Sequence, residues 1–219
     1  MNFQKYKMEQ LIKRIKDNVN LCWQSFSAKV GGGLIVINKE ASMQLQFAYL
    51  LKNSMDLAIH HNDEYVRIEL ETGIPINGRL RECDILIEIK KGEKENFLPI
   101  ELKCYRMKSA SGKLRGAQDL FKFGIYQDLE LLESYKISRK SILSGIQLSM
   151  TDNRNFAYPQ SKEYKSWDYD ISHGHKIENG VQLNTPIGGK PKSFELTNRY
   201  FFDWKQVGFF YFLKLQGFE

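Results

Sequence analysis

The alternation of apolar and polar positions predicts three consecutive β-strands in the first half of the chain. Residues 65–74 (YVRIELETGI) alternate with a period of two, whereas residues 83–89 (CDILIEI) and 97–105 (FLPIELKCY) are nearly continuous apolar runs. Successive side chains of a strand point to opposite faces, so alternation indicates one covered face and a continuous run indicates two. Asn77–Gly78 lies between the first two runs and is a strong turn signal. We therefore expect an antiparallel meander.

Helical periodicity appears on both sides of this meander. Apolar residues recur at intervals of three and four over residues 3–26, 39–61 and 117–136, a pattern typical of amphipathic helices. The positions expected to face the core in the second and third helices are Met43, Phe47, Leu50, Leu51, Leu57, Leu120, Phe123, Ile125, Leu129 and Leu132. Residues 141–150 follow as a fourth strand. A whole helix is available for the crossover, which favours a parallel pairing of this strand with residues 97–105.

From Thr151 onward the pattern changes. Residues 151–180 are polar and aromatic without clear periodicity, and residues 193–204 and 205–216 are aromatic, strand-like runs. The last run is too apolar for an exposed edge, so we expect it to be buried or paired. The chain is predicted to be one α/β domain over residues 1–219. A mixed central β-sheet flanked by helices forms the core at about residues 34–150, and residues 151–219 form a β-rich C-terminal extension.

Composition and charge narrow the class of protein. The 219 residues are 42% hydrophobic, which is enough for one sizeable core, and the net charge of +6 favours a polyanionic partner. No apolar run reaches the roughly 18 residues needed to span a bilayer, and the N-terminus lacks the apolar core of a signal peptide. Cys22, Cys83 and Cys104 have no metal-ligand spacing. Free thiols in a reducing cytoplasm are the simplest interpretation.

Candidate chemistry lies in the two most apolar strands. Asp84 stands near the start of the first, and Glu101 and Lys103 stand two apart on the second, so they share a face. Pairing of the two strands would bring Asp84 beside Glu101. Mg²⁺ typically binds one or two carboxylates together with water and a substrate phosphate, and a nearby lysine can orient the attacking water or stabilise developing charge. A salt-bridged surface pair is the alternative, but the apolar strands around these residues favour a functional site.

The spacing D-x16-E-L-K formed by these three residues resembles the core motif of the PD-(D/E)XK nuclease superfamily. The resemblance covers about residues 39–150 and implies a restriction-endonuclease-like fold with Mg²⁺ as cofactor, for which Mn²⁺ can substitute. It also implies that Asp84 and Glu101 bind the metal and that Lys103 assists the attacking water. Cys83 departs from the pattern, because the family usually has proline there. That proline is the most variable letter of the motif, so the departure affects recognition more than mechanism.

The same resemblance gives three further residues tentative roles. Glu40 lies in the first turn of the second predicted helix, where nuclease relatives often carry an additional metal-binding Glu. Complementarity to the helix dipole explains a Glu at this position equally well, so both interpretations stay open. Gln118 and Tyr126 are similar to the Gln…Tyr element of some exonuclease-like members and are candidates for an accessory role. A glutamine at a helix N-terminus also occurs without any function.

Two basic segments are candidates for nucleic-acid contacts. Lys108, Lys113 and Arg115 follow the candidate catalytic strand in a segment that also contains glycines, and they could hold a DNA backbone through charge. Basic and aromatic residues also alternate irregularly over residues 154–167. This second pattern would suit contact with nucleotides, although packing at the edge of the core explains it as well.

Two other motifs favour a structural interpretation. The three glycines at residues 31–33 are not followed by GK[ST], so they indicate a flexible link and not a phosphate loop. Asp168, Asp170, His173 and His175 could together bind a transition metal. The tripeptide HGH, however, favours a turn between short strands.

The sequence therefore favours a cytoplasmic, Mg²⁺-dependent deoxyribonuclease, for example of a restriction or mobile-element defence system. Its partner would be DNA, and no membrane is involved. Two other functions remain as alternatives. One is a nucleic-acid-binding or structural protein that has the same fold but does not cut. The other is a nuclease subunit that is active only in a homodimer or a larger complex.

Overall fold

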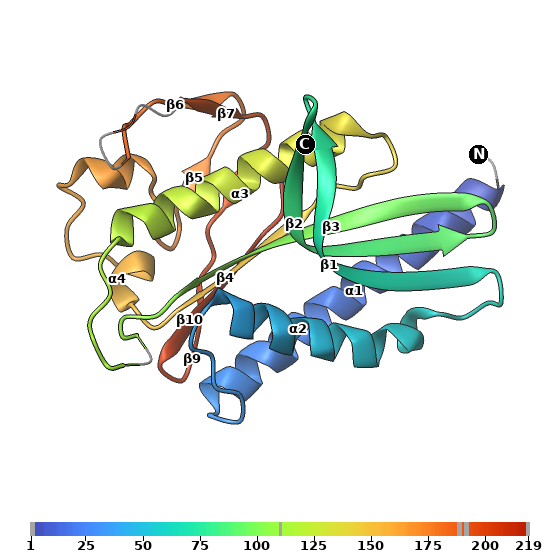
Figure 1. The fold of residues 1–219 in the computed structure, drawn as a ribbon, viewed down its shortest axis with the longest axis horizontal. Helices are drawn as coiled ribbons and strands as arrows, with labels where there is room; N and C mark the ends of the chain where they lie inside the picture. The colour runs from blue at the N-terminus through green and yellow to red at the C-terminus, as the bar shows by residue number, and fades with distance from the viewer. Residues whose placement is uncertain (1–2, 110, 188–189, 191–192, 218–219) are drawn as a thin grey trace.

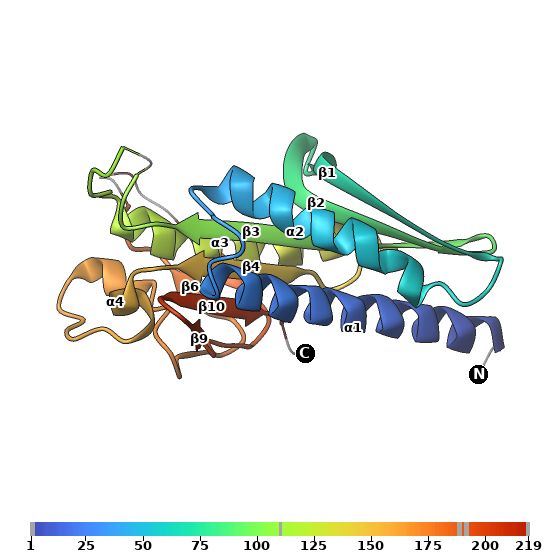
Figure 2. The same ribbon diagram turned by 90° about the horizontal axis from the view of Figure 1, so that it is seen from below.

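The computed structural model describes residues 3–109, 111–187, 190 and 193–217. A mixed β-sheet runs through the molecule, with α1 and α2 on one face and α3 on the other (Figures 1 and 2). Within the described residues the sheet has six strands, which lie in the order β1 (Glu64–Ile76), β2 (Arg79–Lys91), β3 (Lys94–Tyr105), β4 (Ile146–Thr151), β10 (Phe210–Leu215) and β9 (Lys205–Val207).

The predicted meander is confirmed. Strands β1, β2 and β3 pair in antiparallel fashion, and the β1–β2 turn contains Asn77 and Gly78 at φ values of 48° and 75°. Positive φ at both central residues is the conformation that an Asn-Gly hairpin turn favours. The crossover is confirmed as well, because β4 pairs in parallel with β3, with Ile100 opposite Ile146. The helix between these two strands is α3 (Gln118–Ser138).

Two helices cover one face of the sheet. They are α1 (Phe3–Gly31) and α2 (Glu40–Ser54), and a 3-10 helix, η1 (Met55–Ala58), continues from α2. Aromatic rings fill the space between these helices and the sheet: the ring centroids of Trp23 and Phe26 are 5.4 Å apart, and Phe212 of β10 packs edge-on against Trp23. No helix in the described part of the chain combines the length and apolarity that crossing a bilayer requires.

Several expected boundaries and core positions were wrong. Leu57 is 75% exposed, because the chain leaves α-helical geometry after Ser54 and the 3-10 turn rotates this side chain outward. Leu120 is 52% exposed, because the neighbouring Phe121 takes the buried position at the start of α3. The fourth strand begins only at Ile146, since the residues before it form an irregular connection.

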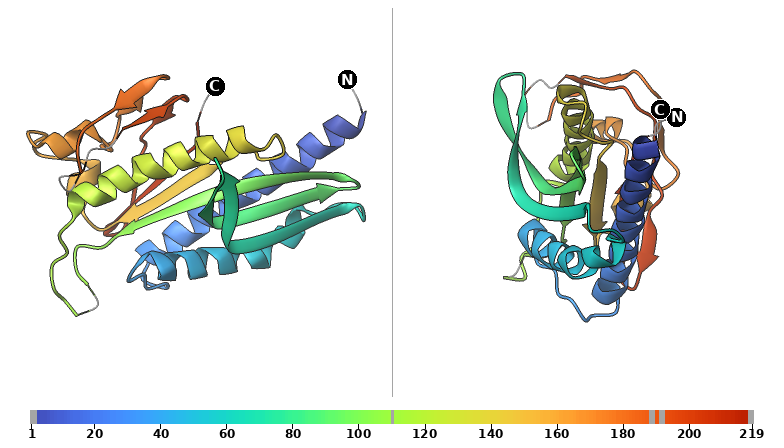
Figure 3. Two further views of the ribbon diagram at one scale, coloured as in Figure 1. Left: turned by 45° about the horizontal axis from the view of Figure 1, so that its top comes forward. Right: turned by 90° about the vertical axis from the view of Figure 1, so that its right-hand side faces the viewer.

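The C-terminal segment contributes to the central sheet as well as covering α3. Strand β10 pairs with β4 and carries β9 on its other side, so the apolar run at the end of the chain is paired and buried, as expected (Figure 3). The sheet is thus not confined to residues 34–150. The remaining short elements are α4 (Arg154–Ala157), η2 (Lys165–Asp168), the β5–β8 pair (Lys176–Ile177 and Tyr200–Phe201) and the β6–β7 pair (Val181–Leu183 and Phe194–Leu196).

One buried carboxylate fastens this segment to α3. The carboxylate of Glu133 accepts hydrogen bonds from the backbone N–H and the hydroxyl of Thr197, both at 2.7 Å. It also accepts from the backbone N–H of Asn198 at 3.0 Å and from the hydroxyl of Tyr200 at 2.8 Å. Because four donors satisfy one side chain, the C-terminal segment has a defined position against the helix that faces the sheet.

A second buried carboxylate connects α1 to the outer strands. Glu64 Oε2 accepts from Arg14 Nη2 at 2.7 Å and from the backbone N–H of His60 at 2.8 Å, while Glu64 Oε1 accepts from Lys91 Nζ at 2.8 Å. Burial opposes the charge of this carboxylate. The hydrogen bonds from Lys91, His60 and Arg14 outweigh burial and lower the pKa of Glu64 to about 2.

Glu64→Gln is expected to lower the free energy of unfolding at pH 7 by about 3 kcal/mol. This is the stabilisation that corresponds to the difference between the pKa of Glu64 in the unfolded and in the folded state. The folded-state pKa lies below the unfolded value of 4.5, so this stabilisation is present above about pH 4.5 and is lost as the pH falls toward 2. Urea unfolding at pH 7 and pH 2.5 measures the effect. The matched control, Glu93→Gln at an exposed turn, should change stability by less than about 0.5 kcal/mol. An equal loss at both pH values would contradict the linkage.

Candidate active site

The candidate site lies where β2 and β3 separate. Their pairing ends at Ile85 opposite Ile100, and the backbone N–H of Leu102 donates to Asp84 Oδ2 at 2.6 Å. The backbone N–H of Cys104 donates to Glu40 Oε2 at 3.0 Å. The two carboxylates thus take the place of the missing strand along this edge of β3, because buried backbone donors need a partner.

The backbone opposite Asp84 is interrupted. The β1–β2 ladder pairs Leu70 with Ile85 and Thr72 with Cys83, but Glu71 between them has a φ of 50°. A positive φ is uncommon for a residue other than glycine and tends to mark a functional or strained position.

Helix α2 provides a hydrogen-bond donor to two acceptors beside this interruption. Gln44 Nε2 donates to the backbone carbonyl of Asp84 at 2.8 Å and to Glu71 Oε1 at 2.6 Å. The contact fixes Asp84 at the point where the strands part. The same helix begins with Glu40, one turn earlier, so α2 positions both carboxylates.

Lys103 is the cation of the site. Its Nζ lies 3.6 Å from Glu40 Oε1 and 3.4 Å from Asp128 Oδ1 of α3. The stem of Lys103 packs against α3 at Gly124, where an added Cβ would lie 3.4 Å away, in ordinary van der Waals contact. The side chain of Lys103 is 24% exposed, so its ammonium sits at the mouth of the site and not within the core.

Glu101 lies deeper. Its carboxyl group is close enough to Asp128 and Asp84 to feel their charges, and its Oε1 atom is buried and has no hydrogen-bond partner among the described residues. Burial, together with the charges of Asp128 and Asp84, raises the pKa of Glu101 to about 9. Neutral pH therefore favours the protonated form of Glu101.

The site as a whole has an excess of negative charge. Four carboxyl groups, from Glu40, Asp84, Glu101 and Asp128, surround the single ammonium of Lys103. Burial raises the pKa of each acid, to about 8 for Asp128. Burial would lower the pKa of Lys103, but these carboxylates, Asp128 foremost, raise it above its ordinary value. Lys103 is thus held protonated.

No group of three or more His, Cys, Asp and Glu side chains is arranged as a metal site in the described part of the chain. The four acids are divided between two smaller arrangements. The charge of Asp84 acts on the buried Glu101, and Glu40 and Asp128 flank the Lys103 ammonium. Asp84 and Glu101 are therefore the two carboxyl groups that Lys103 does not pair with.

Three polar residues of the site were missed in the sequence. Asp128 belongs to α3, and the buried Gln147 and Ser149 belong to β4 beside β3. Gln147 Nε2 donates to Ser149 Oγ at 2.7 Å and lies 3.5 Å from Asp128 Oδ2. The sequence did contain patterns that could have identified them. Asp128 interrupts an apolar helical stripe, and polar residues alternate with apolar ones along β4.

The two accessory candidates lie outside this group of carboxylates. Gln118 is exposed at the start of α3 and hydrogen-bonds to the hydroxyl of Tyr105. Tyr126 is buried, donates from its hydroxyl to the Asp170 carbonyl at 2.6 Å, and lies 3.3 Å from His175 Nε2. Tyr126 therefore faces the C-terminal segment, because its position on α3 points away from the sheet.

The basic segment after β3 has two kinds of residue. Lys108 and Lys113 are exposed on a loop that is closed by a bridge between Lys108 and Leu114. Arg115 is partly buried instead, and its Nη2 donates to the Asn38 carbonyl at 3.1 Å. Arg106 pairs with Asp152 at 2.9 Å. The arginines thus anchor the loop, while the lysines face solvent.

The two histidines of the C-terminal segment lie in a turn, as the HGH tripeptide predicted, with Gly174 at a φ of 84°. They have different partners: His175 Nδ1 lies 3.4 Å from Asp170 and His173 Nδ1 lies 3.6 Å from Asp203. All three cysteines are free thiols.

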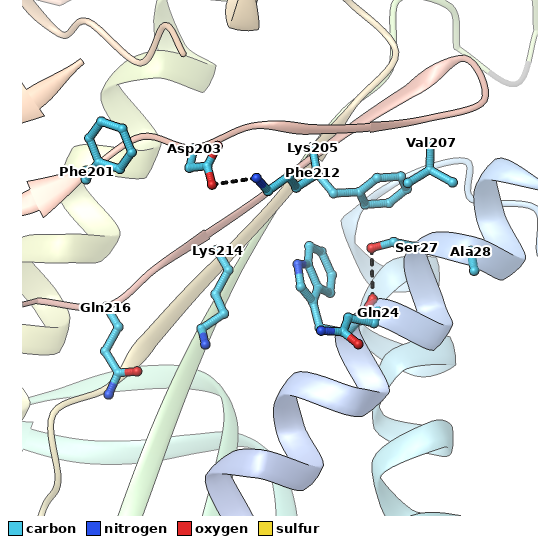
Figure 4. Close-up of a pocket in the computed structure, with 11 residues that line it drawn as sticks. Gln24, Ser27, Ala28, Phe201, Asp203, Lys205, Val207, Phe212, Lys214 and Gln216 are labelled. Carbon is cyan, nitrogen blue, oxygen red and sulfur yellow. Dashed lines mark hydrogen bonds and ion pairs between the residues drawn. The ribbon is translucent and has the colours of Figure 1, made fainter. Parts of the chain in front are cut away.

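A separate pocket lies away from these carboxylates. It has a volume of about 590 Å³ and lies between α1 and the β9–β10 edge (Figure 4). Phe212 and Val207 provide apolar walls, and Lys205, which pairs with Asp203, and Lys214 stand at its sides. None of the four acids lines this pocket. The candidate active site and this pocket are therefore at different places.

Comparison with known proteins gives no family for this chain. No family model matches it, no curated protein is significantly similar, and no solved structure matches its fold. The geometry of the site and the sequence motif are therefore the guides to its function.

Proposed function

We propose that the chain is a Mg²⁺-dependent deoxyribonuclease of the PD-(D/E)XK type with a restriction-endonuclease-like fold. One observation carries the proposal: Asp84, Glu101, Lys103 and Glu40 meet where β2 and β3 separate. The order of elements supports it, because a helix precedes an antiparallel meander and a crossover helix leads to a parallel fourth strand.

The residues present fit a hard divalent cation. Among the residues that the structure describes, Glu101 Oε1 is a buried acceptor without a donor, and the charge of Asp84 opposes ionisation of Glu101, so a cation held by the two carboxyl groups would relieve both. Mg²⁺ prefers oxygen ligands and commonly binds only one or two carboxylates, with water and phosphate completing its coordination. Asp84 and Glu101 would hold it. The bound ion would supply Lewis-acid polarisation of a phosphoryl oxygen and a lowered pKa of water.

The other charged residues have roles that follow from their contacts. Because its carboxylate neighbours keep Lys103 protonated, this residue would act as a hydrogen-bond donor to the substrate phosphate and would stabilise negative charge in the transition state. A protonated amine cannot serve as a general base. Glu40 and Asp128 orient the ammonium, so Glu40 is a positioning residue by its present contacts. Its metal-binding role stays a prediction.

The test is a cleavage assay on the full chain. Linear duplex, circular duplex and single-stranded DNA, with RNA of the same sequence, are incubated with the protein in Mg²⁺, in Mn²⁺ and in EDTA. We expect cleavage of DNA in either metal and none in EDTA. Absence of cleavage in both metals, together with salt-dependent DNA binding, would favour the non-cutting nucleic-acid-binding protein. Absence of both would remove nucleic acid as the substrate class.

DNA binding should depend on the exposed lysines of the loop after β3. The double substitution Lys108→Gln with Lys113→Gln is expected to lower the affinity for DNA of every sequence by the same factor, since phosphate contacts carry no sequence information. The slope of log K against log salt should fall by about two units, roughly one for each lost contact. Fluorescence anisotropy in EDTA across a salt series measures it.

The matched control is Lys94→Gln with Lys140→Gln. Both of these lysines are exposed. Lys94 begins β3, at the end of the strand opposite the loop, and Lys140 follows the C-terminal end of α3. Arg115 is left in place, because it anchors the loop to Asn38 and its loss would change the loop structure as well as the charge. An unchanged salt slope in the loop variant, or an equal change in the control, would contradict this assignment.

A further inference from the structure

A polar pocket lies at the N-terminus of α3. Its volume is about 250 Å³, and it is enclosed by the first turn and a half of α3, by α4 and the chain after it, and by η2. These elements gather at one end of the molecule (Figure 1). Its lining includes Gln118, Lys122, Asn155, Gln160, Tyr164 and Trp167. Drug-sized ligands generally occupy roughly 300–1,000 Å³, so this pocket suits one flat ring system.

A buried ammonium is held in this pocket. Lys122 is 3% exposed and forms no salt bridge with any residue that the structure describes. Its Nζ donates to Ser166 Oγ at 2.8 Å and lies 3.9 Å from the centre of the Trp167 ring. Lysine is rarely buried without a salt-bridge partner. Burial lowers the pKa of Lys122 to about 8, while the charges of Asp119 and Asp170, which form no salt bridge with it, oppose the shift. An ammonium that is buried with one neutral hydrogen-bond partner is suited to an acceptor from outside the chain.

The other lining groups present flat and amide surfaces. Trp167 is partly exposed, unlike Trp23 and Trp204, which are buried. Tyr164 is 78% exposed, and neither its hydroxyl nor the side-chain amide of Gln160 has a hydrogen-bond partner in the described residues. Aromatic rings that stack on a base, with amides and a lysine that read its edge, are the groups that recognise unpaired nucleobases.

One rigid helix connects this pocket to the candidate active site. Gln118 lines the pocket, and Asp128, ten residues later on α3, contacts Lys103. At 1.5 Å per residue this is about 15 Å along the helix. A bound strand could therefore reach from the pocket to the candidate active site within a few nucleotides.

We propose that this pocket holds one unpaired nucleobase of the substrate strand, stacked on Tyr164 beside Trp167 and hydrogen-bonded by Lys122 and the neighbouring amides. The inference rests on the proposed function, because it takes nucleic acid as the substrate. It adds that the substrate has a single-stranded portion within a few nucleotides of the cleaved bond. Single-stranded or overhanging ends should therefore bind better than blunt duplex of the same length.

The first test reads the base contact directly. The full chain is titrated in EDTA with a single-stranded oligonucleotide and with an abasic strand of equal length, which has the phosphates but no bases. Tryptophan fluorescence should change with the first strand and not with the second, and Trp167→Phe should remove the change while anisotropy still reports binding. Equal responses to the two strands would overturn the proposal.

The second test uses an exposed residue whose loss leaves the fold intact. Tyr164→Ala and Lys122→Met should each lower the affinity for the base-bearing strand about 5- to 100-fold, the effect expected for one stacked base. The affinity for the abasic strand should fall less than about twofold. Tyr49→Ala, at a 64% exposed tyrosine on α2, is the matched control and should change neither. Thermal unfolding verifies each variant, and Tyr164→Ala decides the question if Lys122→Met unfolds. Equal loss for both strands, or no loss for either, would contradict the pocket assignment.

Cleavage separates this inference from the function on which it rests. Metal-dependent cleavage with unchanged affinity in the pocket variants would overturn the pocket alone. Base-dependent binding without any cleavage in Mg²⁺ or Mn²⁺ would support the pocket and overturn the nuclease.

Discussion

Glu101→Gln is expected to lower the rate of DNA cleavage by at least roughly 10³-fold, which corresponds to about 4 kcal/mol of lost transition-state stabilisation. Glutamine retains the size of the side chain, but it replaces one carboxylate oxygen by an NH₂ group that cannot bind a cation, and it carries no negative charge. The second metal-binding carboxylate is Asp84, so Asp84→Asn should give a loss of the same order. Gel-based single-turnover assays at saturating Mg²⁺ measure both.

The same substitution should leave the fold intact. Glu101 is buried and already carries a proton at neutral pH, so a neutral amide is a close substitute for the folded state. Its melting temperature should therefore be at least that of the wild type. Mg²⁺ should raise the melting temperature of the wild type, because a ligand that binds only the native state stabilises it by mass action, and this shift should be absent in both variants.

Glu69→Gln provides the matched control. Glu69 lies on β1, pairs with Arg67 at 2.9 Å, and does not contact the four acids. This variant should retain both cleavage and the thermal shift. Cleavage at the wild-type rate by Glu101→Gln would refute the assignment of that residue. A thermal shift that survives in both Asp84→Asn and Glu101→Gln would place the metal elsewhere, and the His173–His175 turn would be the first place to look.

Local periodicity was sufficient to predict the meander and the parallel fourth strand. A two-residue period and an Asn-Gly turn depend only on neighbouring residues, and a parallel pairing follows when a helix lies between two buried strands. The same local information placed Glu101 and Lys103 on one face of β3. Their meeting with Asp84 then needed one further assumption, the β2–β3 hairpin, which the structure contains.

Contacts that depend on tertiary packing could not be predicted in this way. Asp128 reaches Lys103 because α3 packs against β3, and no local pattern encodes the distance between these two elements. The pairing of β10 with β4 joins segments about 60 residues apart, so its sheet position was open even though its burial was expected. In the same way, the positive charge of Arg115 was evident, but its partner, the Asn38 carbonyl, was not.

Lys103→Met is expected to abolish cleavage and also to lower the free energy of unfolding by roughly 2–4 kcal/mol. Removal of one partner from a largely buried ion pair leaves the other charge uncompensated, and here Glu40 and Asp128 both lose their cation. DNA affinity should change by less than about threefold, because binding is assigned to the exposed lysines of the loop and to the pocket at α3. Urea unfolding, single-turnover cleavage and anisotropy measure the three effects.

Addition of Asp128→Asn to Lys103→Met separates the structural role of Lys103 from its catalytic one. Without Lys103, the buried Asp128 carboxyl group must either take up a proton or stay charged without a cation, and the neutral amide removes this cost. The double variant should therefore regain part of the lost stability, and a double-mutant cycle should show a coupling of at least about 1 kcal/mol. Cleavage should stay abolished, because no ammonium is present to stabilise the phosphate in the transition state. Recovery of cleavage together with stability would mean that Lys103 only holds the acidic residues in place. Stable protein without cleavage is the outcome that a catalytic lysine requires.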